Sequence, residues 1–317
     1  WQQRADDALL NVSYDPTREL WRDLNKAFRA EYERDTGKRV AISMSHGSSG
    51  GQARSVIDGL DADVVSLAMW SDTDAIRKAG LIAPGWDKRP HAQPYHSTLV
   101  FVVRAGNPKN IVQWDDLIRG DVSIVTPNPK TSGNGRLSLL AAWGAVLKKE
   151  GGTPEEAERF VTEMYRRTPV LDTGARGSAM TFAKKGMGDV HLTWESDAHL
   201  EVAESNHKLQ VIYPKWSIRA EPPVAVVDAN VDRRGTREVA QKYLEFMFTE
   251  PGQRIIVEHY YRPLEKYDAL RDRGVMQDIE LFDISLIWKD WKKKDWDEVQ
   301  KVFFADNGVF DRIYQKK

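Results

Sequence analysis

One stretch combines small residues, hydroxyls and a single lysine without any acidic residue: residues 126–135 read Thr-Pro-Asn-Pro-Lys-Thr-Ser-Gly-Asn-Gly. An apolar strand pattern, Val122 to Val125, precedes it, and a long amphipathic helix pattern from Arg136 follows. The first turn of a helix leaves backbone N–H groups without partners in the helix and carries a partial positive charge. The pattern therefore predicts an anion-binding loop at a helix start, with Ser132 as the cap residue.

Three other places have the same order of strand, small or capping residues, and helix: Tyr14–Thr17, Ser45–Gly51 and Thr173–Ser178. Ligands of open α/β sheets sit beyond the carboxyl ends of strands, where helix N-termini converge. If the loops converge, they offer many N–H donors and almost no lysine, so uncharged dipoles would bind a small anion. For each loop alone, an ordinary helix cap is the alternative; Asp15, for example, is expected to cap a helix that has Pro16 in its first position.

Enzyme motifs compete with this interpretation. No loop has the spacing of a nucleotide-binding P-loop. Gly47-Ser-Ser-Gly-Gly51 does match Gly-x-Ser-x-Gly between a strand and a helix, which makes Ser49 a candidate hydrolase nucleophile, with Asp189, His191 or His259 as possible partners. The motif arises easily by chance in a Gly/Ser-rich turn. His46, His91 and His96 show no metal-ligand spacing with carboxylates, and neither a metal nor a cofactor is expected.

Composition narrows the class of protein. A chain of 317 residues is long for one core, so two lobes are expected. The formal net charge is -1 and basic residues do not cluster, which argues against a nucleic-acid partner. No apolar run approaches the roughly 20 residues that span a bilayer. The absence of cysteine excludes disulfides, thiolate metal sites and a cysteine nucleophile, and it is compatible with export.

Strand patterns and helix patterns alternate along the chain, and these elements are expected to position the loops. The apolar strand patterns Leu9–Ser13, Val40–Met44 and Val64–Met69 are separated by helix patterns, which predicts a parallel sheet with helices on its faces. Two proline-rich stretches, Pro84–Pro94 and Ala220–Pro223, are expected to cross between lobes.

Five motifs together carry a resemblance to a known family: Asn11-Val-Ser-Tyr-Asp-Pro-Thr-Arg-Glu-Leu20, Ser45-His-Gly-Ser-Ser-Gly50, Thr126-Pro-Asn-Pro-Lys-Thr-Ser-Gly133, Leu171-Asp-Thr-Gly-Ala-Arg-Gly-Ser178 and Asp189-Val-His-Leu-Thr-Trp-Glu195. The chain resembles the sulfate/thiosulfate-binding proteins, the periplasmic receptors of sulfate ABC importers, from about Leu9 to its C-terminus. The resemblance implies a receptor that captures an oxyanion, performs no chemistry and delivers the anion to the membrane subunits of a permease.

The resemblance also implies an architecture. A type II periplasmic binding protein has two α/β lobes, each a mostly parallel sheet flanked by helices, which close by a hinge over a ligand in the cleft. The expected division gives residues 1–88 and about 197–262 to lobe I, 89–196 to lobe II, and 263–317 to a C-terminal helical segment that packs on the lobes. The protein is expected to be a monomer in the periplasm, its signal peptide removed before this numbering begins.

Ligand residues carry over from the family one at a time. Backbone N–H donors are expected from five residues: Asp15, Ser49, Gly133, Asn134 and Ala175. Ser132 would add its hydroxyl and Trp194 its indole N–H, while Arg176 and His46 would support the loops without touching the anion. Sulfate-type members often have glycine where Asn134 stands. Because the motifs resemble both branches, sulfate and thiosulfate remain open, as do a receptor that senses sulfate without transport and a serine hydrolase that uses Ser49.

Overall fold

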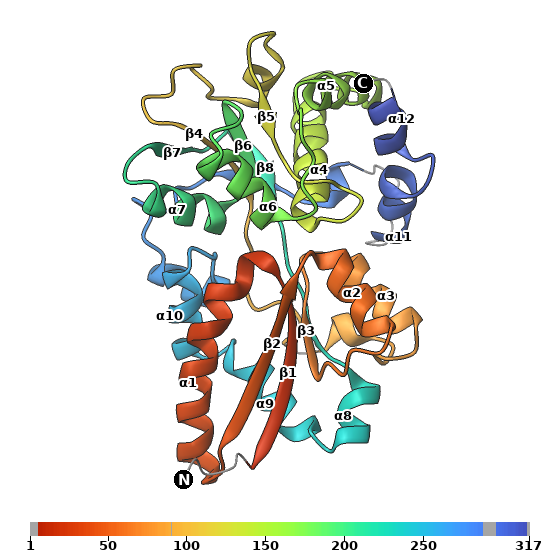
Figure 1. Ribbon diagram of the computed structural model, residues 1–317, viewed down its shortest axis with the longest axis vertical. Coiled ribbons are helices and arrows are strands. Elements are labelled where there is room, and N and C mark those ends of the chain that lie inside the picture. The colour runs from red at the N-terminus through yellow and green to blue at the C-terminus, as the bar shows by residue number, and fades with distance from the viewer. Residues whose placement is uncertain (1–5, 90, 288–295, 316–317) are drawn as a thin grey trace. The chain divides into compact units, whose positions relative to one another are not determined.

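The computed structural model describes residues 6–89, 91–287 and 296–315. The chain forms two compact units (Figure 1). Unit 1 consists of Trp1–His96 and Glu221–Arg271, and unit 2 of Ser97–Ala220 and Asp272–Lys317. In the described part of the chain, no helix combines the length and the apolar character that crossing a membrane requires.

The observed boundaries differ from the expected division in several places; residues 89–96 and 263–271, for example, belong to unit 1. Residues 197–220 belong to unit 2, because the strand Leu209–Ile212 pairs there with the strand Leu99–Arg104. The C-terminal segment from Asp272 also belongs to unit 2 and contains a strand, Glu280–Phe282, as well as helices. Trp288 and Trp291 of this segment lie outside the described residues.

Unit 1 is built on a four-stranded sheet in the order β2-β1-β3-β9. The strands are β1 (Asp7–Tyr14), β2 (Val40–Gly47), β3 (Val64–Ser66) and β9 (Val224–Val226). The first three are parallel to one another, as the alternating pattern predicts, and β9 is antiparallel at the edge. The carboxyl ends of β1 and β2 therefore lie side by side, with Tyr14 paired to Gly47.

Helices cover both faces of this sheet (Figure 1). They are α1 (Arg18–Thr36), α2 (Ser49–Ile57), α3 (Trp70–Lys78), α8 (Asp228–Arg234), α9 (Arg237–Phe246) and α10 (Glu250–Glu258). Strand side chains alternate between two cores: Val64 packs with Trp21 and Phe28 of α1, whereas Val65 packs with Val56 of α2. Every residue of β3 and β9 is buried, whereas buried and exposed residues alternate at the start of β2.

Unit 2 contains a four-stranded sheet in the order β5-β6-β4-β7 and a separate two-stranded sheet. The strands are β4 (Leu99–Arg104), β5 (Ile124–Val125), β6 (Val190–Trp194), β7 (Leu209–Ile212), and the pair β8 (Trp216–Ile218) and β10 (Glu280–Phe282). The larger sheet is mixed: β5 and β6 are parallel, but β4 runs antiparallel to both β6 and β7. The prediction of a mostly parallel sheet is wrong for this unit, because β4 enters the sheet directly from unit 1 and not through a helical crossover.

The helices of unit 2 are α4 (Gly133–Leu147), α5 (Pro154–Arg166), α6 (Ala175–Ala179), α7 (Glu195–Glu204), α11 (Trp296–Val299) and α12 (Val309–Gln315). The amphipathic pattern predicted for α4 is wrong, since every residue from Gly133 to Val146 is buried. On its outer side, a Cβ built at Gly144 would lie 2.2 Å from the ring of Phe282. The helix that begins at the predicted anion loop is thus held on all sides.

Asp228, the first residue of α8, holds three parts of unit 1 together. Its carboxylate accepts from the backbone N–H of Ala83 (2.8 Å), from Arg237 (2.8 Å) and from Arg89 (3.2 Å). Burial alone would raise the pKa of Asp228, but these donors outweigh it and hold the pKa below its ordinary value. The stability that they provide is present above the unfolded-state pKa of about 3.9 and is lost as the pH falls through the lower folded-state value.

The substitution Asp228→Asn should therefore lower stability at neutral pH and flatten its dependence on pH in the acid range. Urea unfolding of both proteins at a series of pH values from about 7 down to about 3 measures this. If the unfolding free energies of the two proteins, plotted against pH, stay parallel below about pH 4, the stabilising role given to the ionised Asp228 carboxylate is contradicted.

Candidate anion-binding site

In unit 1, two predicted donors follow neighbouring strand ends. Asp15 begins a single 3-10 turn, Asp15–Thr17, directly after β1, and Ser49 is the first residue of α2, shortly after β2. The prediction that Asp15 caps this helix is wrong: Tyr14 occupies the cap position, and the Asp15 carboxylate lies 3.5 Å from the guanidinium of Arg18. Both backbone N–H groups belong to first turns, which have no acceptor within their own helix.

The hydroxyl of Ser49 is fixed inside unit 1. It donates to Asp72 Oδ2 at 2.5 Å and accepts from the N–H of Ala68 at 3.0 Å, and Ser49 is 2% exposed. The Ser49 hydroxyl thus gives its hydrogen to a carboxylate. A serine nucleophile instead gives its hydrogen to an adjacent general base such as histidine. The arrangement fits a residue that offers its backbone and not its hydroxyl.

The three residues named as possible hydrolase partners of Ser49 are engaged elsewhere. His259 contacts Asp23 at 2.8 Å, and Asp189 accepts from the N–H of Ser123 at 2.8 Å. His191 lies in unit 2, between Ser178 and Glu201. The geometry therefore does not support hydrolysis at Ser49.

His46 supports the same sheet edge. Its Nδ1 lies 2.6 Å from Ser13 Oγ on the neighbouring strand. Gln52 of α2 donates to the carbonyl of Ser13 at 3.2 Å and to Ser45 Oγ at 3.0 Å. These side chains fix α2 to the ends of β1 and β2, and the supporting role of His46 at an anion stays a prediction.

In unit 2, the loop of residues 126–135, here named the anion loop, ends at α4. Ser132 is the N-cap residue, as predicted, and its hydroxyl accepts from the N–H of Gly135 at 3.3 Å. A Cβ at Gly135 would come within 2.5 Å of the carbonyl of Pro127, so only glycine lets the loop fold back over the helix start. Gly133 and Asn134 are the first two residues of the helix.

Hydrogen bonds join the anion loop to the two other predicted parts of the site. The N–H of Asn128 donates to the carbonyl of Asp172 at 2.7 Å, and the hydroxyl of Thr131 donates to the carbonyl of Thr173 at 2.8 Å. Asn134 Nδ2 lies 3.4 Å from Thr193 Oγ1, at the end of β6. Unit 2 thus links the segments that carry the five donors predicted within it: Ser132, Gly133, Asn134, Ala175 and Trp194.

Ala175 and Trp194, the last two predicted donors, both lie at the start of a helix. Ala175 is buried at the start of α6, after Gly174, and Trp194 is fully buried at the junction of β6 with α7. An indole N–H only donates, which suits a ligand that only accepts. Arg176 follows Ala175, and its side chain is exposed.

Lys130 has a role that sequence reasoning missed. Its ammonium donates to the carbonyls of Phe304 (3.0 Å) and Ala305 (3.2 Å) and to Asp311 (3.0 Å). The lysine in turn lowers the pKa of Asp311. The charge of the anion loop is thus neutralised within unit 2, by partners that no local pattern could have revealed.

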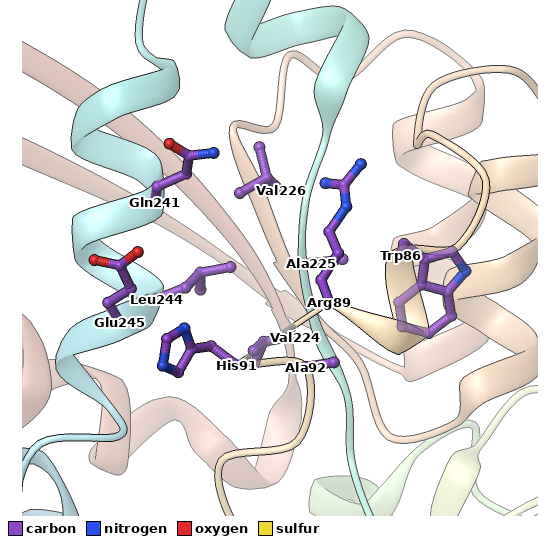
Figure 2. Close-up of a pocket in the computed structure, with 10 residues that line it drawn as sticks. All are labelled: Trp86, Arg89, His91, Ala92, Val224, Ala225, Val226, Gln241, Leu244 and Glu245. Carbon is purple, nitrogen blue, oxygen red and sulfur yellow. The ribbon is translucent and has the colours of Figure 1, made fainter.

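A cavity of about 290 Å³ lies in unit 1 beside the edge strand β9 (Figure 2). Apolar side chains, among them Trp86 and Leu244, line it together with Arg89, His91 and Glu245. Arg89 is paired with Asp228. None of the predicted anion donors lines this cavity, which is therefore distinct from the loops described above.

Comparison with known proteins places this geometry in a family. Residues 10–262 match the family described as bacterial extracellular solute-binding protein. The sulfate-binding protein of Escherichia coli (strain K12) is 46% identical over 314 residues, which cover 98% of this chain and 94% of that protein. The thiosulfate-binding protein of Pseudomonas aeruginosa is 41% identical over 314 residues, covering 98% and 93%.

Among solved structures, the sulfate-binding protein SubI from Mycobacterium tuberculosis H37Rv matches with a TM-score of 0.84 at 26% identity, covering 94% of this chain and 100% of that one. The resemblance drawn from the five motifs is confirmed. These relatives are named as binding proteins, and the chain is a receptor of the same kind, not a hydrolase. The chain belongs to the bacterial extracellular solute-binding protein family.

Proposed function

We propose that the chain binds sulfate through uncharged hydrogen-bond donors. The observation that supports the proposal is that hydrogen bonds join the anion loop to the segments that carry Ala175 and Trp194, while Lys130 of the loop pairs with Asp311. Asp15 and Ser49 of unit 1 would contribute further backbone donors to the anion. The names of the relatives at 46% and 41% identity support an oxo-sulfur anion as ligand.

The donor set predicts discrimination by protonation state. Sulfate at neutral pH carries no proton and only accepts hydrogen bonds, whereas phosphate keeps at least one proton and must also donate. A buried set of donors leaves that proton without an acceptor, which costs about 1–3 kcal/mol. Phosphate should therefore bind about 5- to 150-fold more weakly than sulfate at pH 7. Calorimetric titration of protein that has been unfolded and refolded to remove bound anion measures both affinities, and equal affinities would overturn the donor-only site.

The same titration decides between the two branches of the family. The anion loop, with Asn134 in its helix, resembles thiosulfate-type members, whereas the Gly-Ala-Arg-Gly stretch around Ala175 resembles sulfate-type ones. We propose sulfate as the preferred ligand, since the relative at 46% identity is named for it. A clear preference for thiosulfate in side-by-side titrations would move the assignment to the other branch.

Trp194 is expected to contribute a large share of the affinity. The substitution Trp194→Phe keeps most of the buried ring and removes the indole N–H, a donor to a charged ligand worth about 1.5–3 kcal/mol. Sulfate affinity should fall about 10- to 100-fold in calorimetric titration. Trp143→Phe, in α4 of the same unit, is the matched control and should leave the affinity unchanged. Equal effects of the two substitutions would argue against Trp194 as a ligand.

We further propose that the protein works in the periplasm and delivers its anion to the membrane subunits of an ABC permease. The family description, an extracellular solute-binding protein, supports this location. Expression in a bacterium deleted for its own sulfate- and thiosulfate-binding proteins tests it. Uptake of labelled sulfate should be restored by the wild-type protein and not by Trp194→Phe at limiting sulfate.

A further inference from the structure

The hydroxyl of Thr17 controls the direction of the Asp15 N–H. Thr17 is fully buried in unit 1, and its hydroxyl donates to the carbonyl of Tyr14 at 2.8 Å. This carbonyl and the N–H of Asp15 belong to one planar peptide group, in which they point in opposite directions. The bond from Thr17 therefore fixes the direction in which the Asp15 N–H points.

The next peptide group of the turn is also fixed but supplies no donor. It joins Asp15 to Pro16, and proline has no backbone N–H. Its carbonyl, that of Asp15, accepts from the N–H of Arg18 at the start of α1. The Asp15 N–H thus has no neighbouring N–H at position 16 that could take its place at an anion.

Tyr261 holds the same turn from a distant part of the chain. Its side chain is 1% exposed, and its hydroxyl donates to the carbonyl of Pro16, 245 residues earlier, at 3.0 Å. The carbonyl of Pro16 belongs to the peptide group that leads into Thr17, so the bond fixes the residue whose hydroxyl holds Tyr14. The ring of Tyr261 packs against that of Tyr95, with centroids 4.6 Å apart.

The backbone on either side of Tyr261 is fixed in unit 1. Helix α10 ends in a Schellman motif, in which Tyr260 and Tyr261 donate their N–H groups to the carbonyls of Val257 (2.9 Å) and Ile256 (3.1 Å). Tyr260 has a φ of 60° at the position where glycine is usual, a conformation that a bulky residue keeps only when its surroundings impose it.

On the other side of Tyr261, the backbone of Arg262 pairs with that of His96. The N–H of each residue donates to the carbonyl of the other at 2.9 Å. Tyr261 therefore lies between two fixed points of the backbone, which keep its hydroxyl at the carbonyl of Pro16.

We propose that Thr17 and Tyr261 are positioning residues that hold the Asp15 N–H in its anion-binding direction before the anion arrives. The proposal rests on the proposed function, which makes the Asp15 N–H an anion donor. A donor that is already fixed loses little freedom on binding, so more of its hydrogen-bond energy contributes to affinity. Thr17 acts through the carbonyl of Tyr14 and Tyr261 through that of Pro16, and neither hydroxyl needs to touch the anion.

Two substitutions at Thr17 test this role. Thr17→Val keeps the branched shape and removes the hydroxyl, and it should weaken sulfate binding about five- to tenfold in calorimetric titration. Thr17→Ser keeps the hydroxyl and should stay within about twofold of the wild-type affinity. Urea unfolding without anion measures the stability of each variant. A Thr17→Val protein that is less stable but binds sulfate with wild-type affinity would show that the hydroxyl is merely structural.

Tyr261→Phe tests the distant support. It removes the hydroxyl but keeps the ring against Tyr95, so unit 1 should still fold. Sulfate affinity should fall about two- to fivefold, less than in Thr17→Val, because Tyr261 acts on the Asp15 peptide group only through Thr17. An unchanged affinity would overturn the role of Tyr261.

The far end of α1 supplies matched controls for both changes. The hydroxyl of Tyr32 donates to Asp7 at 2.9 Å, and the hydroxyl of Thr36 donates to the carbonyl of Tyr32 at 2.7 Å. Tyr32→Phe and Thr36→Val thus remove the same chemical groups and the same kinds of hydrogen bond away from the turn. Both should leave sulfate affinity unchanged, and losses equal to those of Tyr261→Phe and Thr17→Val would overturn the positioning role.

Amide NMR of nitrogen-labelled protein observes the positioned donor itself. On addition of sulfate to the wild-type protein, the amide protons of Asp15 and Gly133 should both shift downfield as they bond to the anion. In Thr17→Val the shift of Asp15 should be smaller, while that of Gly133 in unit 2 is retained. Equal Asp15 shifts in the two proteins would refute only the role of Thr17, whereas a wild-type protein that does not bind sulfate would refute the proposed function.

Discussion

Replacing Asn134 by aspartate should abolish most sulfate binding. Asn134 is 2% exposed in the first turn of α4; its Oδ1 accepts from Ser138 at 3.1 Å and its Nδ2 faces Thr193. The substitution keeps the shape, and both neighbouring hydroxyls can donate to the new carboxylate, so unit 2 should still fold. A unit charge about 4 Å from another repels it by about 4 kcal/mol near a protein surface, or about a thousandfold in affinity.

Calorimetric titration at pH 7 measures this loss. Asn134→Gly is the control, because it keeps the backbone donor and adds no charge, and its affinity should stay within about tenfold of wild type. Binding by Asn134→Asp should partly return as the pH falls toward about 4 and the carboxylate is protonated, while wild-type binding should not improve. Tight binding by Asn134→Asp at pH 7 would show that this side chain lies far from the anion.

The second large effect is expected on stability, at Asp63. This fully buried residue accepts from the N–H of Leu10 (2.7 Å) and from the hydroxyl of Thr236 (2.5 Å), and it pairs with Arg234 (3.4 Å). It thus joins β1 to the turn between α8 and α9 in unit 1. Asp63→Ala leaves these donors buried without their acceptor and should lower the free energy of unfolding by about 3–5 kcal/mol.

Asp61→Ala is the control for this prediction. Asp61 lies two residues away and also pairs with an arginine of α8, Arg233, but both side chains are more than half exposed. Exposed pairs add little to stability, so its urea midpoint should move only slightly. Similar midpoints for the two alanine variants would contradict the role given to Asp63.

Local patterns predicted well where some helices begin. Ser132 caps α4, as predicted, and Thr153 forms a capping box at the start of α5 with Glu156, which the spacing Thr153-Pro-Glu-Glu156 indicates. These assignments succeed because a cap depends on residues only three positions apart. The family motifs placed the loops at strand ends for the same local reason.

The predictions that were wrong concern features that depend on distant parts of the chain. The burial of α4 on all sides depends in part on a segment that follows it by more than a hundred residues and contains Phe282. The Asp72 carboxylate that fixes the Ser49 hydroxyl lies on another helix, and the direction of β4 depends on how the chain enters unit 2. Hydrophobic periodicity and turn residues are local features of the sequence, so they do not predict such long-range contacts.

The bonds of Lys130 have a consequence for the order in which the protein is made. Its partners, Phe304, Ala305 and Asp311, follow it by 174 to 181 residues. While the chain is being synthesised, the anion loop emerges long before the groups that neutralise its lysine. The contacts that join the anion loop to the C-terminal segment can therefore form only after Asp311 has been added to the chain.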